Sequence, residues 1–104
     1  MVSWRRSRPQ ASPPEVRLTA RVVGMVQGVG FRYRTAMKAY ELSLTGTVKN
    51  NDDGSVGVVA EGTTDAVDQF VDWLNSPRAP GRVAKVEQST SPASGEFTDF
   101  DIIA

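Results

Sequence analysis

The sequence predicts an α+β fold, a two-layer ferredoxin-like sandwich with both helices on one face of the sheet. Three observations support it: segments with strand-type alternation, two segments with helical spacing, and the element order βαββαβ with a short terminal strand. Strands that alternate apolar and polar residues bury one face only, so both helices must cover that same face. A length of 104 residues without an internal repeat fits one domain.

The first half of the predicted domain places a glycine-rich loop between a strand and a helix. Residues 16–22 alternate as a half-buried strand does, with apolar Val16, Leu18, Ala20 and Val22. After the loop at residues 24–30, the spacing predicts one buried helix face made of Tyr33, Ala36, Met37 and Tyr40. Strands at 45–49 and 55–60 are predicted to form a hairpin, because Asp53-Gly54 supplies the positive φ of a tight turn.

The second half predicts one more helix and the closing strands. Either Thr63 or Thr64 can cap this helix, and acidic residues follow in its first turn, where they suit the positive end of the helix dipole. Its apolar face is predicted to consist of Val67, Phe70, Val71 and Leu74. Strands at 82–88 and 98–103 complete the predicted sheet.

Residues 1–14 are predicted to be a disordered leader rich in proline and arginine, which leaves residues 15–104 as the folded domain. The Arg5-Arg6 pair invites a twin-arginine export interpretation, but polar, proline-rich residues follow where an apolar region is needed. No apolar run approaches the ~20 residues of a membrane span. We therefore expect a cytoplasmic protein without a membrane partner.

Composition restricts the chemistry open to this chain. It has no cysteine and no histidine, which excludes disulfides, cysteine or histidine nucleophiles and makes the common zinc sites very unfavourable. The net charge is zero, yet residues 1–49 hold nine of the twelve basic residues and two acidic ones. A stretch without acidic residues predicts a positive potential suited to a small anion; its cations are Arg17, Arg21, Arg32, Arg34 and Lys38.

The segment 26–32, Val-Gln-Gly-Val-Gly-Phe-Arg, is the candidate anion site. Helix N-termini present unpaired N–H groups, and glycines let a loop close around a phosphate. Arg32 and Arg34 lie in the first helical turn, where cations oppose the macrodipole, and such violations occur mostly at functional sites. The alternative is that both arginines point into solvent and the glycines only make a turn. The loop lacks the Gly-Lys-Ser/Thr of a Walker A motif.

Two further features lie at the predicted hairpin. Asn50 ends the strand that enters it, where an asparagine is either a turn residue or a functional amide. Asp52 and Asp53 suggest a divalent metal, but adjacent carboxylates on a tight turn diverge, and no other acidic residue has suitable spacing. We therefore expect no metal and no other cofactor.

Segments 26–32, 42–50 and 53–56 together resemble the signature segments of the acylphosphatase family. The second and third read Leu-Ser-Leu-Thr-Gly-Thr-Val-Lys-Asn and Asp-Gly-Ser-Val, and the element order agrees over residues 16 to about 103. The resemblance implies a metal-independent hydrolase that cleaves the carboxyl–phosphate bond of small acyl phosphates by direct attack of water. The expected partners are the acyl phosphate and the product inorganic phosphate, with no nucleic acid, and we expect a monomer.

The same resemblance implies the roles of individual residues. The catalytic residues are Arg32, which binds the phosphoryl group, and Asn50, which orients the attacking water. Arg32 shares the substrate phosphate with the backbone amides of Gln27, Gly28, Val29, Gly30 and Phe31. The planar fork of arginine matches two phosphate oxygens, and the substrate itself can accept the water's proton.

Two residues inside the domain depart from the family pattern. Ser43 stands where glycine is usual after the first helix, and we expect strain there because serine tolerates a left-handed turn less well than glycine. Thr47 stands where a large aromatic is common, and we expect looser packing beside the site.

Two rival functions stay open from the sequence. A non-catalytic anion-binding module would use the same loop and would not need Asn50. A nucleic-acid binder would use the arginine-rich leader, but the predicted strands offer Val, Thr and Ala where such sheets need stacking aromatics.

Overall fold

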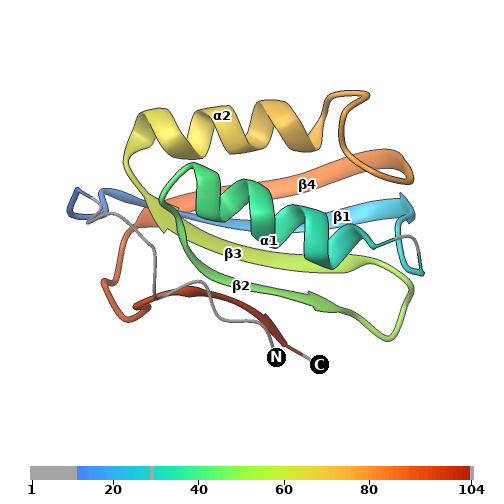
Figure 1. The fold of residues 1–104 in the computed structure, drawn as a ribbon, viewed down its shortest axis with the longest axis horizontal. Coiled ribbons are helices and arrows are strands. Elements are labelled where there is room, and N and C mark those ends of the chain that lie inside the picture. The colour runs from blue at the N-terminus through green and yellow to red at the C-terminus, as the bar shows by residue number, and fades with distance from the viewer. Residues whose placement is uncertain (1–11, 29, 104) are drawn as a thin grey trace.

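The computed structural model describes residues 12–28 and 30–103, and it confirms the predicted ferredoxin-like α+β sandwich (Figure 1). Across the sheet the strand order is β4-β1-β3-β2-β5; β2 and β5 pair in parallel, and the other pairs are antiparallel. Both helices lie on the same face of the sheet (Figure 1). In chain order the elements are β1 (Val16–Met25), α1 (Phe31–Glu41), β2 (Thr45–Asn50), β3 (Val56–Gly62), α2 (Thr64–Leu74), β4 (Arg82–Pro92) and β5 (Phe100–Ile103).

The core lies between the helices and the sheet face that they cover. The alternation predicted for β1 is confirmed, because its apolar residues Leu18, Ala20 and Val22 are buried. The predicted face of α2 is buried at Val67, Phe70 and Leu74, while Val71 is partly buried against the core. The Phe70 ring meets Phe100 of β5 edge to face, with centroids 6.4 Å apart, so α2 reaches across the sheet to the strand at its far edge.

The predicted buried face of α1 is confirmed at Ala36 and wrong at its three large side chains. Tyr33 is 46% exposed, and Met37 and Tyr40 are only partly buried. The predicted face relied on large side chains in the middle of the helix, whereas α1 packs on the sheet there through a threonine and two alanines, with Phe31 at its start. A buried threonine is not recognised by a pattern of apolar residues. The residues that α1 buries are Phe31, Thr35, Ala36 and Ala39.

Strand lengths differ from the prediction because of pairing partners. β1 continues to Met25 and β4 to Pro92, since the two strands pair antiparallel along their lengths, with a bulge between Val23 and Gly24. β5 begins at Phe100, where its parallel pairing with Gly46 begins. The Asp-Gly hairpin between β2 and β3 is confirmed.

The predicted leader falls largely on residues 1–11, which lie outside the described residues. Residues 12–14 are exposed and have neither helix nor strand. Glu15 is bound to the domain: its N–H donates to the Gly62 carbonyl at 2.8 Å, and its carboxylate accepts the Thr64 N–H at 2.8 Å. Glu15 is therefore held to β3 and α2, and the boundary between leader and domain stays a prediction. Over the described ranges, neither helix is long and apolar enough to cross a membrane.

Candidate active site

A pocket of about 180 Å³ joins the loop after β1, the start of α1 and the ends of β2 and β5. It brings together five of the predicted site residues: Gly28, Gly30, Phe31, Arg32 and Asn50. Gln27 is not among the lining residues, and Val29 lies outside the described residues. The remaining lining residues are Val26, Tyr33 and Ile102.

The start of α1 leaves backbone donors at this pocket. Gly30 is the N-cap in a left-handed conformation with φ 74°, and no side chain caps the helix there. Gly28 has a φ of 79°, and a Cβ at either glycine would meet no atom within 4 Å. Glycine is therefore needed for its conformation rather than for space. The first N–H groups of an α-helix have no intrahelical acceptor, so the start of α1 can present backbone donors to an anion.

Arg32 supplies a cation beside these donors. Its Nη1 lies 3.4 Å from the Ile103 carbonyl oxygen, a long hydrogen bond, and it forms no ion pair with a carboxylate of the described residues. Arg34 lies about 200° further around the helix and is exposed. The first turn of α1 contains no acidic residue, so an anion at the pocket meets no opposing carboxylate from this helix.

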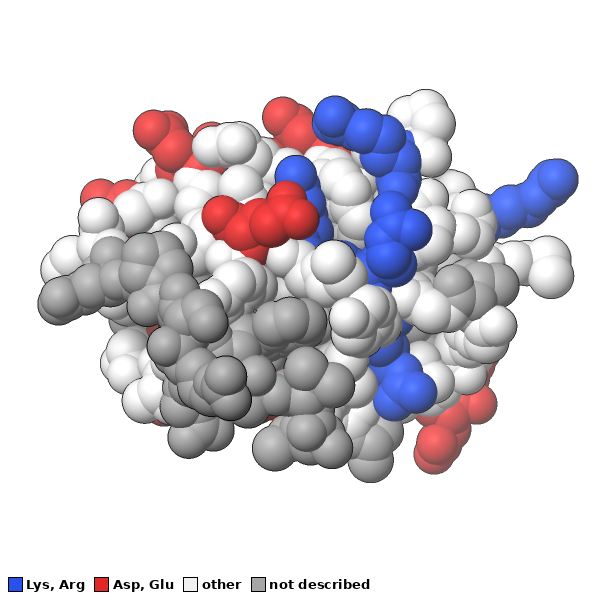
Figure 2. All heavy atoms as spheres, in the orientation of Figure 1, with Lys and Arg blue, Asp and Glu red and all other residues white. Residues whose placement is uncertain are grey.

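The basic stretch predicted from the sequence divides into two groups. On β1, Arg17 and Arg21 each pair with two carboxylates, whereas the charges of Arg32 and Arg34 on α1 are not compensated in this way by described residues. Figure 2 shows Lys and Arg side chains in a stripe across the face on which α1 lies. Carboxylates neutralise Arg17 and Arg21, so the positive potential that we expected from five cations is strongest at the start of α1, beside the pocket.

Asn50 reaches the pocket as the last residue of β2. Alternation along β2 places Asn50 on the same side as buried Val48, toward the helices. Its side-chain amide makes no hydrogen bond to another described residue, so it can hold a water. Thr47 lies on the opposite face, where it pairs with Asp101 of β5, so the looser packing that we expected beside the site is not supported.

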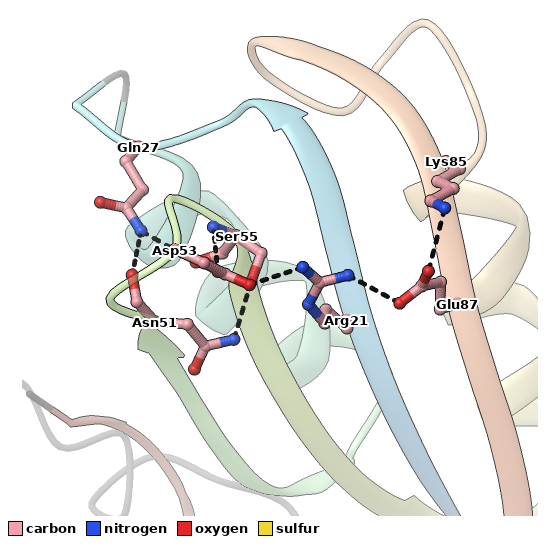
Figure 3. Close-up of polar contacts among 7 residues, drawn as sticks. All are labelled: Arg21, Gln27, Asn51, Asp53, Ser55, Lys85 and Glu87. Carbon is pink, nitrogen blue, oxygen red and sulfur yellow. Dashed lines mark hydrogen bonds and ion pairs between the residues drawn. The ribbon is translucent and has the colours of Figure 1, made fainter.

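The Asp53 carboxylate of the hairpin is engaged by neighbouring protein groups. Asp53 accepts hydrogen bonds from the Ser55 hydroxyl and N–H and forms an ion pair with Arg21 at 2.5 Å (Figure 3). The Ser55 hydroxyl and Arg21 together hold the pKa of Asp53 well below its usual range. Within the described residues no group of three or more metal-ligating side chains occurs. Asp53 therefore serves the turn and its contact with β1.

Sequence reasoning missed part of the pocket wall. Ile102 arrives through the parallel pairing of β5 with β2, opposite Val48, and nothing local in the sequence signals that pairing. Tyr33 lines the pocket although its spacing favoured a buried position. The side chain of Gln27 was also missed, since Nε2 donates to the carbonyls of Asn51 and Ser55 at 2.9 and 2.8 Å.

A larger hollow of about 330 Å³ lies where α2 leads into β4. It contains none of the predicted site residues, and its one charged lining residue, Lys85, pairs with Glu87 at 3.0 Å. An anion has no uncompensated cation there. The pocket at the start of α1 is therefore the candidate active site.

Several known proteins are similar to this chain. The family profile described as Acylphosphatase matches residues 18–102. The chain is 62% identical over 89 residues to a protein described as Acylphosphatase from Arthrobacter sp. (strain FB24), covering 86% of this chain and 82% of that protein. A relative of the same description from Thermobifida fusca (strain YX) is 49% identical over 87 residues, 84% of this chain and 96% of its own. The crystal structure of acylphosphatase from Bacillus subtilis superposes with a TM-score of 0.78 at 36% identity, covering 86% of this chain and 99% of the other. The chain therefore belongs to the acylphosphatase family.

Proposed function

We propose that this protein is an acylphosphatase, which hydrolyses small acyl phosphates to a carboxylate and inorganic phosphate. One observation carries the proposal: a single pocket contains the uncapped N-terminus of α1, the cation of Arg32 and the amide of Asn50. A phosphoryl group needs backbone donors and a forked cation, and hydrolysis needs a positioned water. The identity to acylphosphatases over most of the chain agrees with it.

In the proposed reaction, the loop amides and the Arg32 guanidinium bind the three outer phosphoryl oxygens. Asn50 holds a water in line with the bond to the acyl oxygen. The water oxygen attacks phosphorus, the bond from phosphorus to the acyl oxygen breaks, the carboxylate leaves, and a phosphate oxygen accepts the proton. The protein supplies position and charge stabilisation, so a chain without histidine or cysteine needs no protein base.

The test is hydrolysis of benzoyl phosphate by the purified protein, with and without a chelator. We expect turnover in both conditions and competitive inhibition by inorganic phosphate, because the product occupies the same donors. Loss of turnover with the chelator, restored by magnesium, would contradict the metal-independent mechanism. Phosphate binding without any turnover would instead support the non-catalytic anion-binding module.

We further propose that the protein acts as a monomer in the cytoplasm. The pocket is lined by residues of one chain, so a second copy is not needed to complete it. A chain without cysteine does not depend on an oxidising compartment. Light scattering across a concentration series should give the mass of one chain, 11.3 kDa.

A further inference from the structure

The side chain of Gln27 connects the loop of the candidate anion site at residues 26–32, here called the anion loop, to the β2–β3 hairpin. Its Nε2 donates to the Asn51 carbonyl at 2.9 Å and to the Ser55 carbonyl at 2.8 Å (Figure 3). Both acceptors are backbone oxygens, so the amide orientation is fixed by chemistry, because the reversed amide would set its oxygen against two carbonyls. Gln27 is exposed, and yet both hydrogens of its amide are committed to the hairpin.

The hairpin does not need Gln27 to close. The Ser55 carbonyl already accepts the Asn51 N–H at 2.9 Å, and the Asn51 carbonyl accepts the Gly54 N–H at 3.2 Å. The Asn51 amide also donates to the Ser55 hydroxyl at 2.9 Å. Each carbonyl keeps a partner without Gln27, so its side chain adds a connection between two segments rather than satisfying a buried group.

The hairpin is held from β1 as well. Asp53 pairs with Arg21, which also pairs with Glu87 on β4, so contacts run from β4 across β1 to the hairpin and on to Gln27 (Figure 3). Arg21 lies on β1 and Gln27 lies in the loop that follows it. One segment of chain therefore carries the anion loop and also holds the hairpin in two places.

We propose that Gln27 is a positioning residue, whose side chain fixes Asn50 at the base of the hairpin relative to the phosphate bound by the loop. Asn51, the acceptor of one Gln27 bond, directly follows Asn50. In-line attack depends on the distance between a bound phosphoryl group and a bound water, and these two are held by different segments. This inference rests on the proposed acylphosphatase activity and adds how its two halves keep their spacing.

The first test is Gln27→Leu, which keeps similar size and removes both donors. Because Arg32 and the loop amides stay, we expect the inhibition constant for inorganic phosphate to change by less than about three-fold. The kcat for benzoyl phosphate should fall by ~10- to 100-fold, since a misplacement near 1 Å can cost 10² in rate. An unchanged kcat in the folded variant would overturn the proposal.

A double-mutant cycle with Asn50→Ala tests whether Gln27 affects kcat through Asn50. If Gln27 acts by placing Asn50, Gln27→Leu should leave the residual kcat of Asn50→Ala unchanged, because nothing remains to be positioned. If the two reductions multiply instead, Gln27 acts independently of Asn50 and the proposal fails. A residue that only stabilised the fold would show no such dependence on Asn50.

A third variant, Gln27→Glu, is nearly isosteric and serves if Gln27→Leu folds poorly. A protonated carboxyl restores one donor, whereas a carboxylate has none and faces two carbonyl oxygens, which raises the pKa of the introduced group. The ratio of variant to wild-type kcat should therefore be highest at acid pH and fall as pH rises through that pKa. Gln69→Glu, at an exposed position of α2, adds the same charge and should show a flat ratio.

The outcomes separate this inference from the activity on which it rests. Wild-type protein that fails to hydrolyse benzoyl phosphate overturns the proposed function itself. Active wild-type protein with a flat Gln27→Glu ratio overturns the role of Gln27 alone and leaves the activity in place.

Discussion

The two helices begin at opposite ends of the sandwich (Figure 1), and their first backbone N–H groups differ in whether side chains cap them. At one end, Thr63 is the N-cap of α2: its hydroxyl accepts the Ala66 N–H at 3.2 Å. The Glu15 carboxylate accepts the Thr64 N–H of the same helix. At the other end, Gly30 is the N-cap of α1, and among the described residues no side chain caps this helix. Both helices have eleven residues, so length does not explain the difference.

A buried carboxylate at the capped end also has hydrogen-bond donors for both of its oxygens. Glu61, at the end of β3, has a fully buried side chain that accepts bonds from Arg17, from the Ser94 N–H and hydroxyl, and from the Gly95 N–H. Helix termini and buried charges are stabilised only when they have partners. The capped end therefore stabilises the fold, and the uncapped end keeps its donors for a ligand.

The largest effects should come from substitutions at the uncapped end. Asn50→Ala should lower kcat on the order of 10² or more, as for loss of an oriented polar group, while phosphate inhibition stays nearly intact. Arg32→Lys keeps the charge but loses the bidentate fork, so both phosphate affinity and kcat should fall. Steady-state kinetics with benzoyl phosphate and phosphate inhibition measure both.

Arg34→Lys is the matched control for Arg32→Lys, because Arg34 is exposed on another side of α1. It should change neither constant appreciably. If Arg34→Lys is as damaging as Arg32→Lys, the role given to Arg32 is wrong. If Asn50→Ala weakens phosphate binding as much as turnover, Asn50 holds the phosphate rather than the water.

At the capped end, Glu61→Gln should lower the free energy of unfolding by about 1–3 kcal/mol, because the new amide faces donors that require an acceptor. kcat at a temperature below the transition should remain that of wild type. Denaturant unfolding and kinetics on the same samples check both, and a loss of kcat in the folded variant would break the division between the two ends.

Low pH should lower the free energy of unfolding through the same Glu61 carboxylate. Burial alone would raise the pKa of Glu61, but donation from Ser94, Arg17 and Gly95 outweighs it and lowers that pKa to about 2. A folded pKa below the ordinary value of 4.5 means that this stabilisation is complete above about pH 4.5 and is lost as pH falls toward 2. The free energy of unfolding between pH 7 and 3 should therefore fall less in Glu61→Gln than in wild type.

Removal of the α2 N-cap should lower stability less than the loss of the Glu61 carboxylate. Thr63→Ala should lower the free energy of unfolding by about 1 kcal/mol, the usual effect of losing a threonine N-cap. Because α1 carries the site and α2 does not, kcat and phosphate inhibition should not change. Thr64→Ala, one residue into the helix and exposed, is the control and should leave stability nearly unchanged.

A smaller effect, of opposite sign, is expected where α1 ends. Ser43 has a φ of 59°, and the Leu44 N–H donates to the Ala39 carbonyl while the Ser43 N–H donates to that of Tyr40, which is the Schellman pattern. Ser43→Gly should raise the free energy of unfolding by about 0.5–1 kcal/mol, since glycine adopts this conformation without strain. Ser43→Ala should bring no such gain, and a gain as large would show that the hydroxyl, not the backbone, is the source.

Removal of the leader should have the smallest effect. A chain that begins at Pro14 keeps Glu15, whose carboxylate serves the α2 N-terminus, so activity should stay within about ten-fold of wild type. Circular dichroism and benzoyl phosphate hydrolysis compare the two chains. Failure of the shorter chain to fold would place the domain boundary before residue 14.

The sequence by itself predicted the fold class and the loop at residues 26–32 from local rules: alternation predicts one-sided strands, and glycines between a strand and a helix start predict a loop that can close around an anion. The roles proposed for Arg32 and Asn50 came from the resemblance to the acylphosphatase family, since an asparagine at the end of a strand can equally be a turn residue. Ser43 is a further local case, since its left-handed conformation follows from its place after a helix.

Only the tertiary structure decided which of the described arginines stay unpaired and can bind an anion, and which distant residues complete the pocket. The sequence groups Arg17, Arg21 and Arg32 together, but the carboxylate partners of Arg17 and Arg21 lie far along the chain, so this pairing could not be predicted from spacing. The same applies to Ile102, brought to Asn50 by a parallel strand, and to Gln27, whose acceptors lie on the hairpin. Local patterns encode backbone conformation, whereas contacts between distant segments depend on a register that exists only in the folded sheet.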